Sequence, residues 1–437
     1  MGACMKAIFV SAFEPAAVGH GGNHRAYQVA HDLEQAVGTD ELTVVSLPRW
    51  YQSSSAEQLP TSPLSKDSSR PPASPQERKM RTQRIRFKLG RLLPLVHVDR
   101  RVALLDRARG TADLHLSVKF MEFYEQLARE IGKPAVCVIE HVGFAPLLAI
   151  NSRYGIATVS CVANIEAFDQ AALAGQFQQG KVYSTAIDFA REVGVLARCD
   201  ARLFISKVEA GLIGGLGLPS EYYPYLPVGA IRQNLDGIRQ IRARDRSTPG
   251  LFLMLGTAEH TTTRASFSWF VQCVRDNGLP RGTRVVVCGS RTDKLLPSDI
   301  SVAGLDLRGW VDQDHLDELL TRVQAVLVPQ LTGFGSLTRL PELACAGIPV
   351  IASTHATHAV DPTPGLHVAD PAWDAWCSAM AQLANSEGQV SHSHYLAWEE
   401  KQANPLRTLV SEMARNLHSN DHATCTARDG AVSDNGE

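Results

Sequence analysis

The sequence predicts an α/β protein of two consecutive doubly wound domains that face each other across a cleft. Short apolar runs such as 6–11 and 251–256 lack polar alternation, which is typical of strands buried on both faces of a parallel sheet. These runs alternate with helical patterns, and the alternation restarts near residue 250 after a polar stretch. The 437 residues suffice for two such domains, each with its own core.

The N-terminal domain is expected to span residues 1–230. A glycine-rich turn at 19–22 follows the first strand and precedes a helical pattern, as in the opening of a doubly wound sheet. Helices are expected after that turn and at 146–153. Strands are expected at 6–11, 42–47, 135–140, 158–162 and 200–206.

An insertion interrupts this domain after its second strand. Residues 53–75 contain eight serines and five prolines, so we expect a mobile segment at about 52–77. Residues 78–109 carry eleven Lys or Arg against two Asp, with apolar residues on one helical face. This basic stretch fits peripheral contact with an anionic membrane, or a solvated cationic helix beside the mobile segment.

The C-terminal domain is expected at 250–390, after a polar linker at 231–249. A C-terminal helix is expected at 391–417 and a disordered tail at 418–437. Helices are predicted at 265–277, 314–323 and 340–346. Strands are predicted at 251–256, 284–288, 305–308, 325–329 and 349–352.

Composition narrows the class of protein. A net charge of −2 argues against nucleic-acid binding, and nine scattered cysteines without a Cys-x-x-Cys pair indicate buried thiols in a reducing compartment. No signal peptide and no apolar run of about 18 residues is evident, so we expect a cytoplasmic protein. His392 and His394 lack the spacing of metal ligands, and no metal site is expected.

The strongest chemical signal is the segment 332–342. Gly333 and Gly335 let backbone approach a ligand and expose amides at a helix start, where Arg339 adds a permanent cation. This combination favours a diphosphate, and Glu342 could accept hydrogen bonds from a ribose diol. The alternative is an ordinary strand–loop–helix whose Arg339 and Glu342 form a surface pair.

With the following Ala344, Gly347, Pro349 and Val350, this segment resembles the C-terminal domain of GT-B glycosyltransferases, especially glycosyltransferase family 4 (group 1). The resemblance covers about 120 residues, 251–370, and implies two Rossmann-like domains facing a central cleft. It implies that Arg339 binds the diphosphate and Glu342 the ribose of a nucleotide-sugar donor. One departure is Phe334, where many members carry a second glutamate.

The resemblance assigns further donor-binding positions in both domains. The loop after the first strand of the second domain supplies Gly256, with His260 or Arg264 in place of the family's Arg and Lys. In the first domain the glycine loop supplies Gly21 and Gly22. The remaining positions are Arg25, Val311, Gly333, Gly335, Ser336 and Leu337.

His141 ends a predicted strand at a point that opens into the cleft, and the family's His at this position touches the donor sugar. A structural role for this lone His is an equal alternative. Ala163-Asn-Ile-Glu166 resembles the family's His-Asn-x-Glu segment with Ala in place of His, so a role for Glu166 is doubtful. His141, Arg339 and Glu342 are the expected catalytic residues.

The resemblance implies a glycosyltransferase that retains the anomeric configuration and uses a UDP- or GDP-sugar as substrate. With no metal-binding pattern in the sequence, we expect it to be metal-independent and to need no cofactor. The N-terminal domain would hold the acceptor, which is a glycan, a lipid-linked sugar or a small molecule. The basic stretch would place the protein peripherally at the inner face of the membrane. The alternatives are a nucleotide-sugar epimerase of the same fold and a non-catalytic homologue that binds a nucleotide-sugar or a partner protein.

Overall fold

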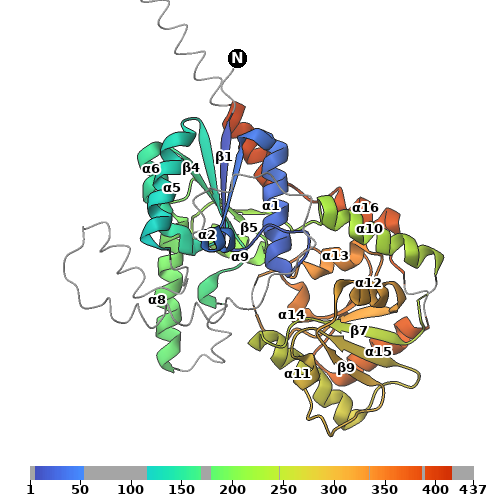
Figure 1. Cartoon of the computed structure of the whole chain (residues 1–437). Helices are drawn as coiled ribbons and strands as arrows, with labels where there is room; N and C mark the ends of the chain where they lie inside the picture. The colour runs from blue at the N-terminus through green and yellow to red at the C-terminus, as the bar shows by residue number, and fades with distance from the viewer. Residues whose placement is uncertain are drawn as a thin grey trace, which may run out of the picture.

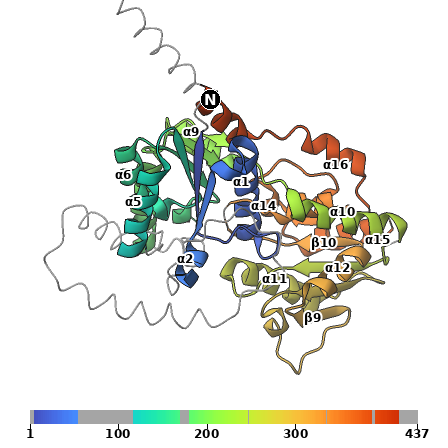
Figure 2. The same cartoon turned by 45° about the horizontal axis from the view of Figure 1, so that its top comes forward.

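The computed structural model describes residues 5–53, 116–168, 179–245, 247–333, 335–385 and 389–415. It contains two α/β domains, each built on a six-stranded sheet (Figures 1 and 2). The predicted mobile insertion, apart from residues 52–53, and the basic stretch 78–109 lie outside the described residues. The predicted tail 418–437 also lies outside them. The predicted fold class, α/β with two doubly wound sheets, is confirmed.

The N-terminal sheet has the order β2-β1-β3-β4-β5-β6, and its neighbouring strands are parallel. The order reverses between β1 and β3, so the crevice at the carboxyl ends of these strands is the expected ligand position. Its strands are β1 (Lys6–Ser11), β2 (Leu42–Ser46), β3 (Ala135–Ile139), β4 (Ala157–Val162), β5 (Ala201–Phe204) and β6 (Glu221–Tyr222). Its helices are α1 (Gly21–Val37), α2 (Leu47–Ser53), α5 (Val118–Ile131), α6 (Ala145–Tyr154), α8 (Gln179–Leu196) and α9 (Lys207–Gly215).

The C-terminal sheet has the order β12-β11-β10-β7-β8-β9, again with parallel neighbours, and it reverses between β7 and β10. Its strands are β7 (Leu251–Leu255), β8 (Arg284–Cys288), β9 (Leu305–Gly309), β10 (Ala325–Val328), β11 (Val350–Ser353) and β12 (Leu366–Ala369). Its helices are α11 (Thr261–Asn277), α12 (Gln313–Arg322), α13 (Arg339–Cys345), α14 (Thr354–Thr357) and α15 (Trp373–Ala384).

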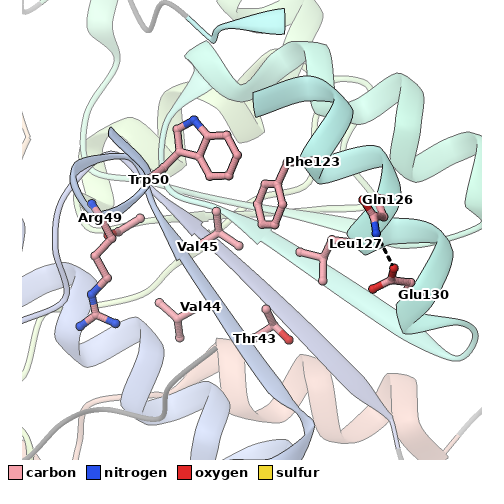
Figure 3. A pocket seen from close by; sticks show the side chains of 10 residues that line it. Thr43, Val44, Val45, Arg49, Trp50, Phe123, Gln126, Leu127 and Glu130 are labelled. Atoms are coloured by element: carbon pink, nitrogen blue, oxygen red, sulfur yellow. Dashed lines mark hydrogen bonds between the residues drawn. The ribbon is translucent and has the colours of Figure 1, made fainter. Parts of the chain in front are cut away.

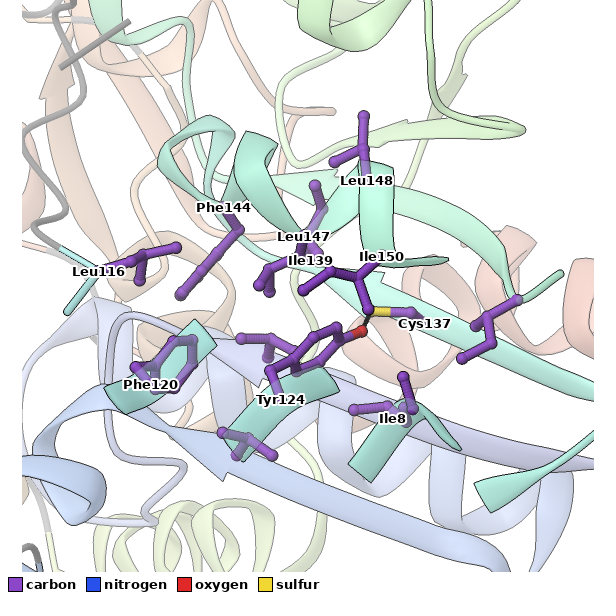
Figure 4. Close-up of a cluster of buried hydrophobic side chains, with 14 of the residues drawn as sticks. Ile8, Leu116, Phe120, Tyr124, Cys137, Ile139, Phe144, Leu147, Leu148 and Ile150 are labelled. Atoms are coloured by element: carbon purple, nitrogen blue, oxygen red, sulfur yellow. Dashed lines mark hydrogen bonds between the residues drawn. The ribbon is translucent and has the colours of Figure 1, made fainter. Parts of the chain in front are cut away.

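Helix α5 closes one face of the N-terminal sheet. Its Phe120 and Tyr124 are fully buried against β1 and β3 (Figure 4). The Tyr124 hydroxyl contacts Cys137 Sγ at 3.1 Å and donates to Asn151 Oδ1 at 2.7 Å. Burial raises the pKa of Cys137 to about 11. That thiol therefore packs as a small apolar group, as the spacing of the cysteines predicts.

The predicted linker at 231–249 is mostly helix α10 (Gly229–Arg244), which docks on the C-terminal domain. Arg239 donates to the carbonyls of Ala344 and Cys345, each at 2.5 Å. Arg242 donates to the carbonyl of Val323 at 2.7 Å. The sequence predicts a polar linker here because the segment is rich in charged residues. In the structure, two of these residues, Arg239 and Arg242, donate to carbonyls at the ends of α13 and α12, so the segment is a docked helix.

The predicted C-terminal helix at 391–417 is divided in two. The helix α16 (His392–Glu399) is followed by a second helical segment at 405–415. Asn404 caps this segment by accepting the amide of Arg407 at 3.1 Å, and Pro405 occupies its first position. Its Leu406 and Val410 are fully buried in the N-terminal core, so the chain ends its described course on the first domain.

This return is fixed by a charge pair. Arg407 Nη2 lies 3.1 Å from Asp32 Oδ1, and the Tyr223 hydroxyl also donates to Asp32, which is 1% exposed. Burial opposes ionisation of Asp32, but the neighbouring His31 imidazole, the Tyr223 hydrogen bond and the Arg407 charge lower the pKa of this carboxyl below its ordinary value. Its stabilising effect is therefore present at neutral pH and lost as pH falls through the lowered pKa.

Asp32→Asn should lower the free energy of unfolding at pH 7 by about 1–3 kcal/mol, since it removes hydrogen bonds to a buried charged group. The difference from the unsubstituted protein should shrink as pH falls below about 4, where the carboxylate of the unfolded chain becomes protonated. Chemical denaturation between pH 3 and pH 7 measures both. Asp276→Asn, at an exposed carboxylate bonded to Gln272, is the matched control. A difference that is constant with pH would contradict this account of Asp32.

Candidate functional site

The carboxyl ends of the two sheets face each other. The first turn of α1 meets the start of α13, because a Cβ atom on Gly21 would lie 2.6 Å from Thr338 Oγ1. The loop before α13 meets the loop after β4, where a Cβ atom on Gly335 would lie 3.0 Å from the Ala163 carbonyl oxygen. Lys207 Nζ, at the start of α9, lies 2.5 Å from Asp361 Oδ1 of the second domain. Both topological switch points therefore border one interdomain site.

Arg339 occupies the switch point of the C-terminal sheet. Its Nη1 donates to the carbonyl of Leu255 at the end of β7, and it lies beside Gly256, where a Cβ atom would be 3.4 Å from Nη1. Burial lowers the pKa of Arg339, and the Glu342 charge opposes that shift. Among the described residues no carboxylate forms an ion pair with this guanidinium. A partly buried cation without an ion-pair partner is suited to an anionic ligand.

The glycine loop before α13 requires its glycines. Gly333 has φ 115° and Gly335 has φ 77°, which are conformations that side chains with a Cβ atom rarely adopt. The Gly333 carbonyl oxygen lies 2.7 Å from His355 Nε2, which fixes the loop to α14. Ser336 is partly buried, and Leu337 packs against the C-terminal core. Gly333 is buried, and Gly335 packs against the Ala163 carbonyl of the other domain, so this loop is held between the two domains, and the Leu337 side chain belongs to the C-terminal core.

Glu342 is held from the opposite domain. Its Oε1 lies 2.7 Å from His24 Nδ1 on α1 and accepts the Tyr225 hydroxyl at 2.7 Å. Burial opposes ionisation of Glu342, yet His24, Tyr225 and Arg339 together lower its pKa. Burial likewise opposes the charged form of His24, but Glu342 raises the pKa of the imidazole. Sequence patterns did not single out His24 or Tyr225, because the contact joins residues more than 100 positions apart.

The other predicted donor positions of the C-terminal domain lie at strand ends. His260 and Arg264 are exposed at the start of α11, on the loop that follows β7. Val311 is partly buried and packs against the C-terminal core, whereas its neighbour Trp310 is 71% exposed. The side chains of His260 and Arg264 are therefore accessible to a ligand. The Val311 side chain is committed to packing, so only its backbone remains a candidate for ligand contact.

Arg25 does not face the interdomain site. It is 1% exposed, and its guanidinium donates to the carbonyls of Tyr223 at 3.0 Å and Pro224 at 3.3 Å. It also stacks over the Tyr223 ring, 3.9 Å from the centroid. The expectation that Arg25 binds phosphate is corrected, because its helical position turns the side chain into the N-terminal core. Gly21 and Gly22 form the first turn of α1, with His20 as its capping residue.

His141 follows β3 and pairs with Glu166. The Gly143 amide donates to His141 Nδ1 at 2.9 Å, so the ring proton resides on Nε2, which lies 3.1 Å from Glu166 Oε1. Both side chains are less than one-fifth exposed. The doubtful Glu166 is thus the partner of the predicted catalytic His141.

Two buried carboxylates fix the loop that carries Glu166. Glu192 on α8 accepts the amides of Glu166 at 2.9 Å and Ala167 at 3.1 Å. Glu209 on α9 accepts the amide of Ile165 at 2.8 Å. Burial raises the pKa of Glu192 to about 7, with the amide bonds opposing the shift. Neither glutamate belongs to a recognisable motif.

Glu140 and Ser11 mark the switch point of the N-terminal sheet, at the ends of β3 and β1. The Ser11 hydroxyl donates to Glu140 Oε2, while Glu140 Oε1 is buried without a hydrogen-bond partner among the described residues. Burial raises the pKa of Glu140 to about 7, and Ser11, Arg25 and His141 oppose the shift.

A cavity of about 390 Å³ lies beside the glycine loop, at the ends of β10, β11 and β12. His355 joins the two, since it lines this cavity and also contacts the Gly333 carbonyl. No sequence motif pointed to these residues. The lining residues are Gln330, Leu331, Ser353, Thr354, His355, His358 and Pro371.

A second, smaller cavity of about 90 Å³ lies between β2 and α5 (Figure 3). Trp50 and Phe123 stack at 4.5 Å between ring centroids on its wall. It contains none of the predicted site residues. In the described residues, no cluster of three His, Cys, Asp or Glu could hold a metal ion. No described helix combines the length and apolar character needed to cross a membrane.

No protein-family model and no curated protein sequence matches the chain. Among solved structures, the sucrose-phosphate synthase of Thermosynechococcus elongatus matches with a TM-score of 0.56 at 13% identity, covering 95% of this chain and 100% of that chain. The α,α-trehalose 6-phosphate synthase of Burkholderia multivorans matches with a TM-score of 0.51 at 11% identity, over 100% of both chains. Anabaena HepE in complex with UDP and glucose matches at 0.51 and 10% identity, over 95% and 100%.

These likenesses, together with the two parallel sheets, show that the chain has the GT-B fold of glycosyltransferases. At identities of 10–13% they establish the fold and no more.

Glu140→Gln should remove a pH dependence of stability. A buried carboxyl with a raised pKa stabilises the folded protein while protonated, and this contribution is lost as pH rises from about 4.5 towards 7. The glutamine variant should therefore gain stability relative to the unsubstituted protein over that interval and show a constant difference above it. Thermal denaturation from pH 4.5 to 8 measures this. Glu130→Gln, at an exposed carboxylate bonded to Gln126, serves as control, and a parallel response of all three proteins would refute the assignment.

Proposed function

We propose that this protein is a glycosyltransferase that moves a sugar from a nucleotide diphosphate-sugar to an acceptor held by the N-terminal domain. The observation that carries the proposal is the Arg339 guanidinium at the switch point of the C-terminal sheet. It is partly buried, fixed on the Leu255 carbonyl and without an ion pair among the described residues. Negative charge develops on the diphosphate as the glycosidic bond breaks, and a preorganised cation there lowers the barrier.

The surrounding residues fit the remaining parts of a donor. The loop at Gly333 and Gly335, whose positive φ angles suit glycine, leads directly into the helix α13 that begins at Arg339, where a diphosphate would meet helix-terminus amides. Glu342 is ionised and retains Oε2 for a ribose hydroxyl, because His24 and Tyr225 both bind Oε1. His260 and Arg264 at the accessible start of α11 add basic groups. UDP-sugars are the first donors to test, since HepE has been solved with UDP and glucose.

Retention of the anomeric configuration is the expected stereochemical course, on the resemblance to family 4. His141, whose Nε2 proton is directed to Glu166, is the residue we assign to the donor sugar. The acceptor is a glycan, a lipid-linked sugar or a small molecule, and the basic stretch 78–109 would bring the protein to a membrane surface.

Arg339→Ala should reduce transfer, or hydrolysis of the donor without acceptor, by about 10²–10³-fold, since it removes a charge placed where the transition state becomes negative. Arg322→Ala is the matched control, because Arg322 is an exposed residue of α12 paired with Glu318. Turnover of UDP- and GDP-sugars measures the effect. Equal turnover of the Arg339 variant and the control would overturn the donor site.

A thermal-shift screen with UDP-, GDP- and ADP-sugars identifies which donor binds. Product analysis of the bound donor, incubated without an acceptor, then distinguishes a transferase from an epimerase. A ligand at 100 times its dissociation constant stabilises the folded protein by about 2.7 kcal/mol. Conversion of the donor alone into its epimer would establish the epimerase instead. Failure of every nucleotide-sugar to bind would favour a non-catalytic homologue.

Chelation should leave activity unchanged. In the proposed site the diphosphate charge is met by Arg339 and by loop amides, so no divalent cation is required. Turnover with and without EDTA, each followed by added Mg²⁺ or Mn²⁺, measures this. Loss of activity that Mn²⁺ restores would contradict the proposed metal independence.

A further inference from the structure

Glu342 is bound by side chains from outside its own domain. His24 comes from α1 of the N-terminal domain, and Tyr225 comes from the segment between β6 and α10. Both contact the same oxygen, Oε1, at 2.7 Å. No described side chain donates a hydrogen bond to the other oxygen, Oε2.

The two helices that carry this contact are brought together one turn earlier. Gly21 precedes His24 by three positions and Thr338 precedes Glu342 by four, so each pair lies on one helical face. Gly21 allows Thr338 to approach so closely that a Cβ atom would not fit. His24 therefore reaches Glu342 because glycine occupies the preceding turn of α1.

The charges of the three groups agree with a fixed carboxylate. Burial and Glu342 raise the pKa of the Tyr225 hydroxyl well above its ordinary value, so Tyr225 remains a hydrogen-bond donor. His24 donates through Nδ1, and its Nε2 is buried without a hydrogen-bond partner among the described residues.

We propose that His24 and Tyr225 are positioning residues for ribose recognition: they hold Oε1 of Glu342 so that Oε2 accepts a hydroxyl of the donor's ribose. The inference rests on the proposed donor site and adds a condition to it. Because His24 and Glu342 belong to different domains, Glu342 is fully oriented only while the domains are in contact. A carboxylate with one oxygen fixed loses less rotational freedom on binding, which favours the ligand that can use the other oxygen.

The test compares the affinities of UDP, 2′-deoxy-UDP and 3′-deoxy-UDP by calorimetry. The unsubstituted protein should bind UDP more tightly than at least one deoxy analogue, by about tenfold or more, since loss of a hydrogen bond to a charged group has this effect. Glu342→Gln should bind all three similarly. His24→Ala and Tyr225→Phe should lose most of the same discrimination, and His24→Gln, which keeps an N–H donor, should recover part of it.

Tyr154→Phe is the matched control, because its hydroxyl also donates to a glutamate, Glu125, away from the domain contact. A merely structural role would weaken UDP and the deoxy analogues alike and leave their ratio unchanged. Discrimination that is lost in Glu342→Gln but kept in His24→Ala and Tyr225→Phe would overturn this inference and leave the donor site standing. If the unsubstituted protein binds GDP and not UDP, the same comparison is made with GDP, 2′-deoxy-GDP and 3′-deoxy-GDP. Absence of both UDP and GDP binding would overturn the inference and the donor site together.

Discussion

The contact between the first turn of α1 and the start of α13 governs the arrangement of the site. At Gly21 and Thr338 the two domains approach within a distance that excludes a Cβ atom, and His24 then meets Glu342 one turn further on. A second close approach, at Gly335 and Ala163, brings the glycine loop against the segment that carries Glu166. Glycine at both positions thus serves interdomain proximity, in addition to any backbone approach to a ligand.

The two domains place different titratable groups around this contact. The C-terminal side presents a partly buried cation, Arg339, and a carboxylate of lowered pKa, Glu342, which we propose bind a diphosphate and a ribose respectively. The N-terminal side places Glu140 and Glu192 under its cleft-facing loops, where burial raises the pKa of each to about 7. A pKa of about 7 leaves each carboxyl partly protonated near neutral pH, so these two glutamates place less negative charge under the loops than two ordinary glutamates would.

Much of the fold could be predicted from the sequence because buried parallel strands appear as short apolar runs. The runs at 251–256 and 325–329 correspond to β7 and β10, and the glycines at 333 and 335 proved to need positive φ. Charged segments were harder to interpret. The polar range 231–249 is a docked helix, because Arg239 and Arg242 bind backbone carbonyls that no local pattern reveals. Arg25 shows the same difficulty, since its burial depends on the carbonyls of Tyr223 and Pro224, nearly 200 residues away.

The same reasoning explains why sequence patterns could point to candidate site residues but not to the side chains that contact them. Gly333, Arg339 and Glu342 are close in sequence, so spacing alone groups them. His24, Tyr225, Glu192 and Glu209 act through contacts between distant elements, and each is ordinary in its local context. His141 could be predicted only in part. Its position just after β3 follows from the strand pattern. The position of its ring proton depends on the Gly143 amide, and its contact with Glu166 depends on a loop that Glu192 holds. Both ring nitrogens of His141 are thereby engaged within the N-terminal domain, Nδ1 by the Gly143 amide and Nε2 by Glu166, so the orientation of the ring is fixed by this domain alone.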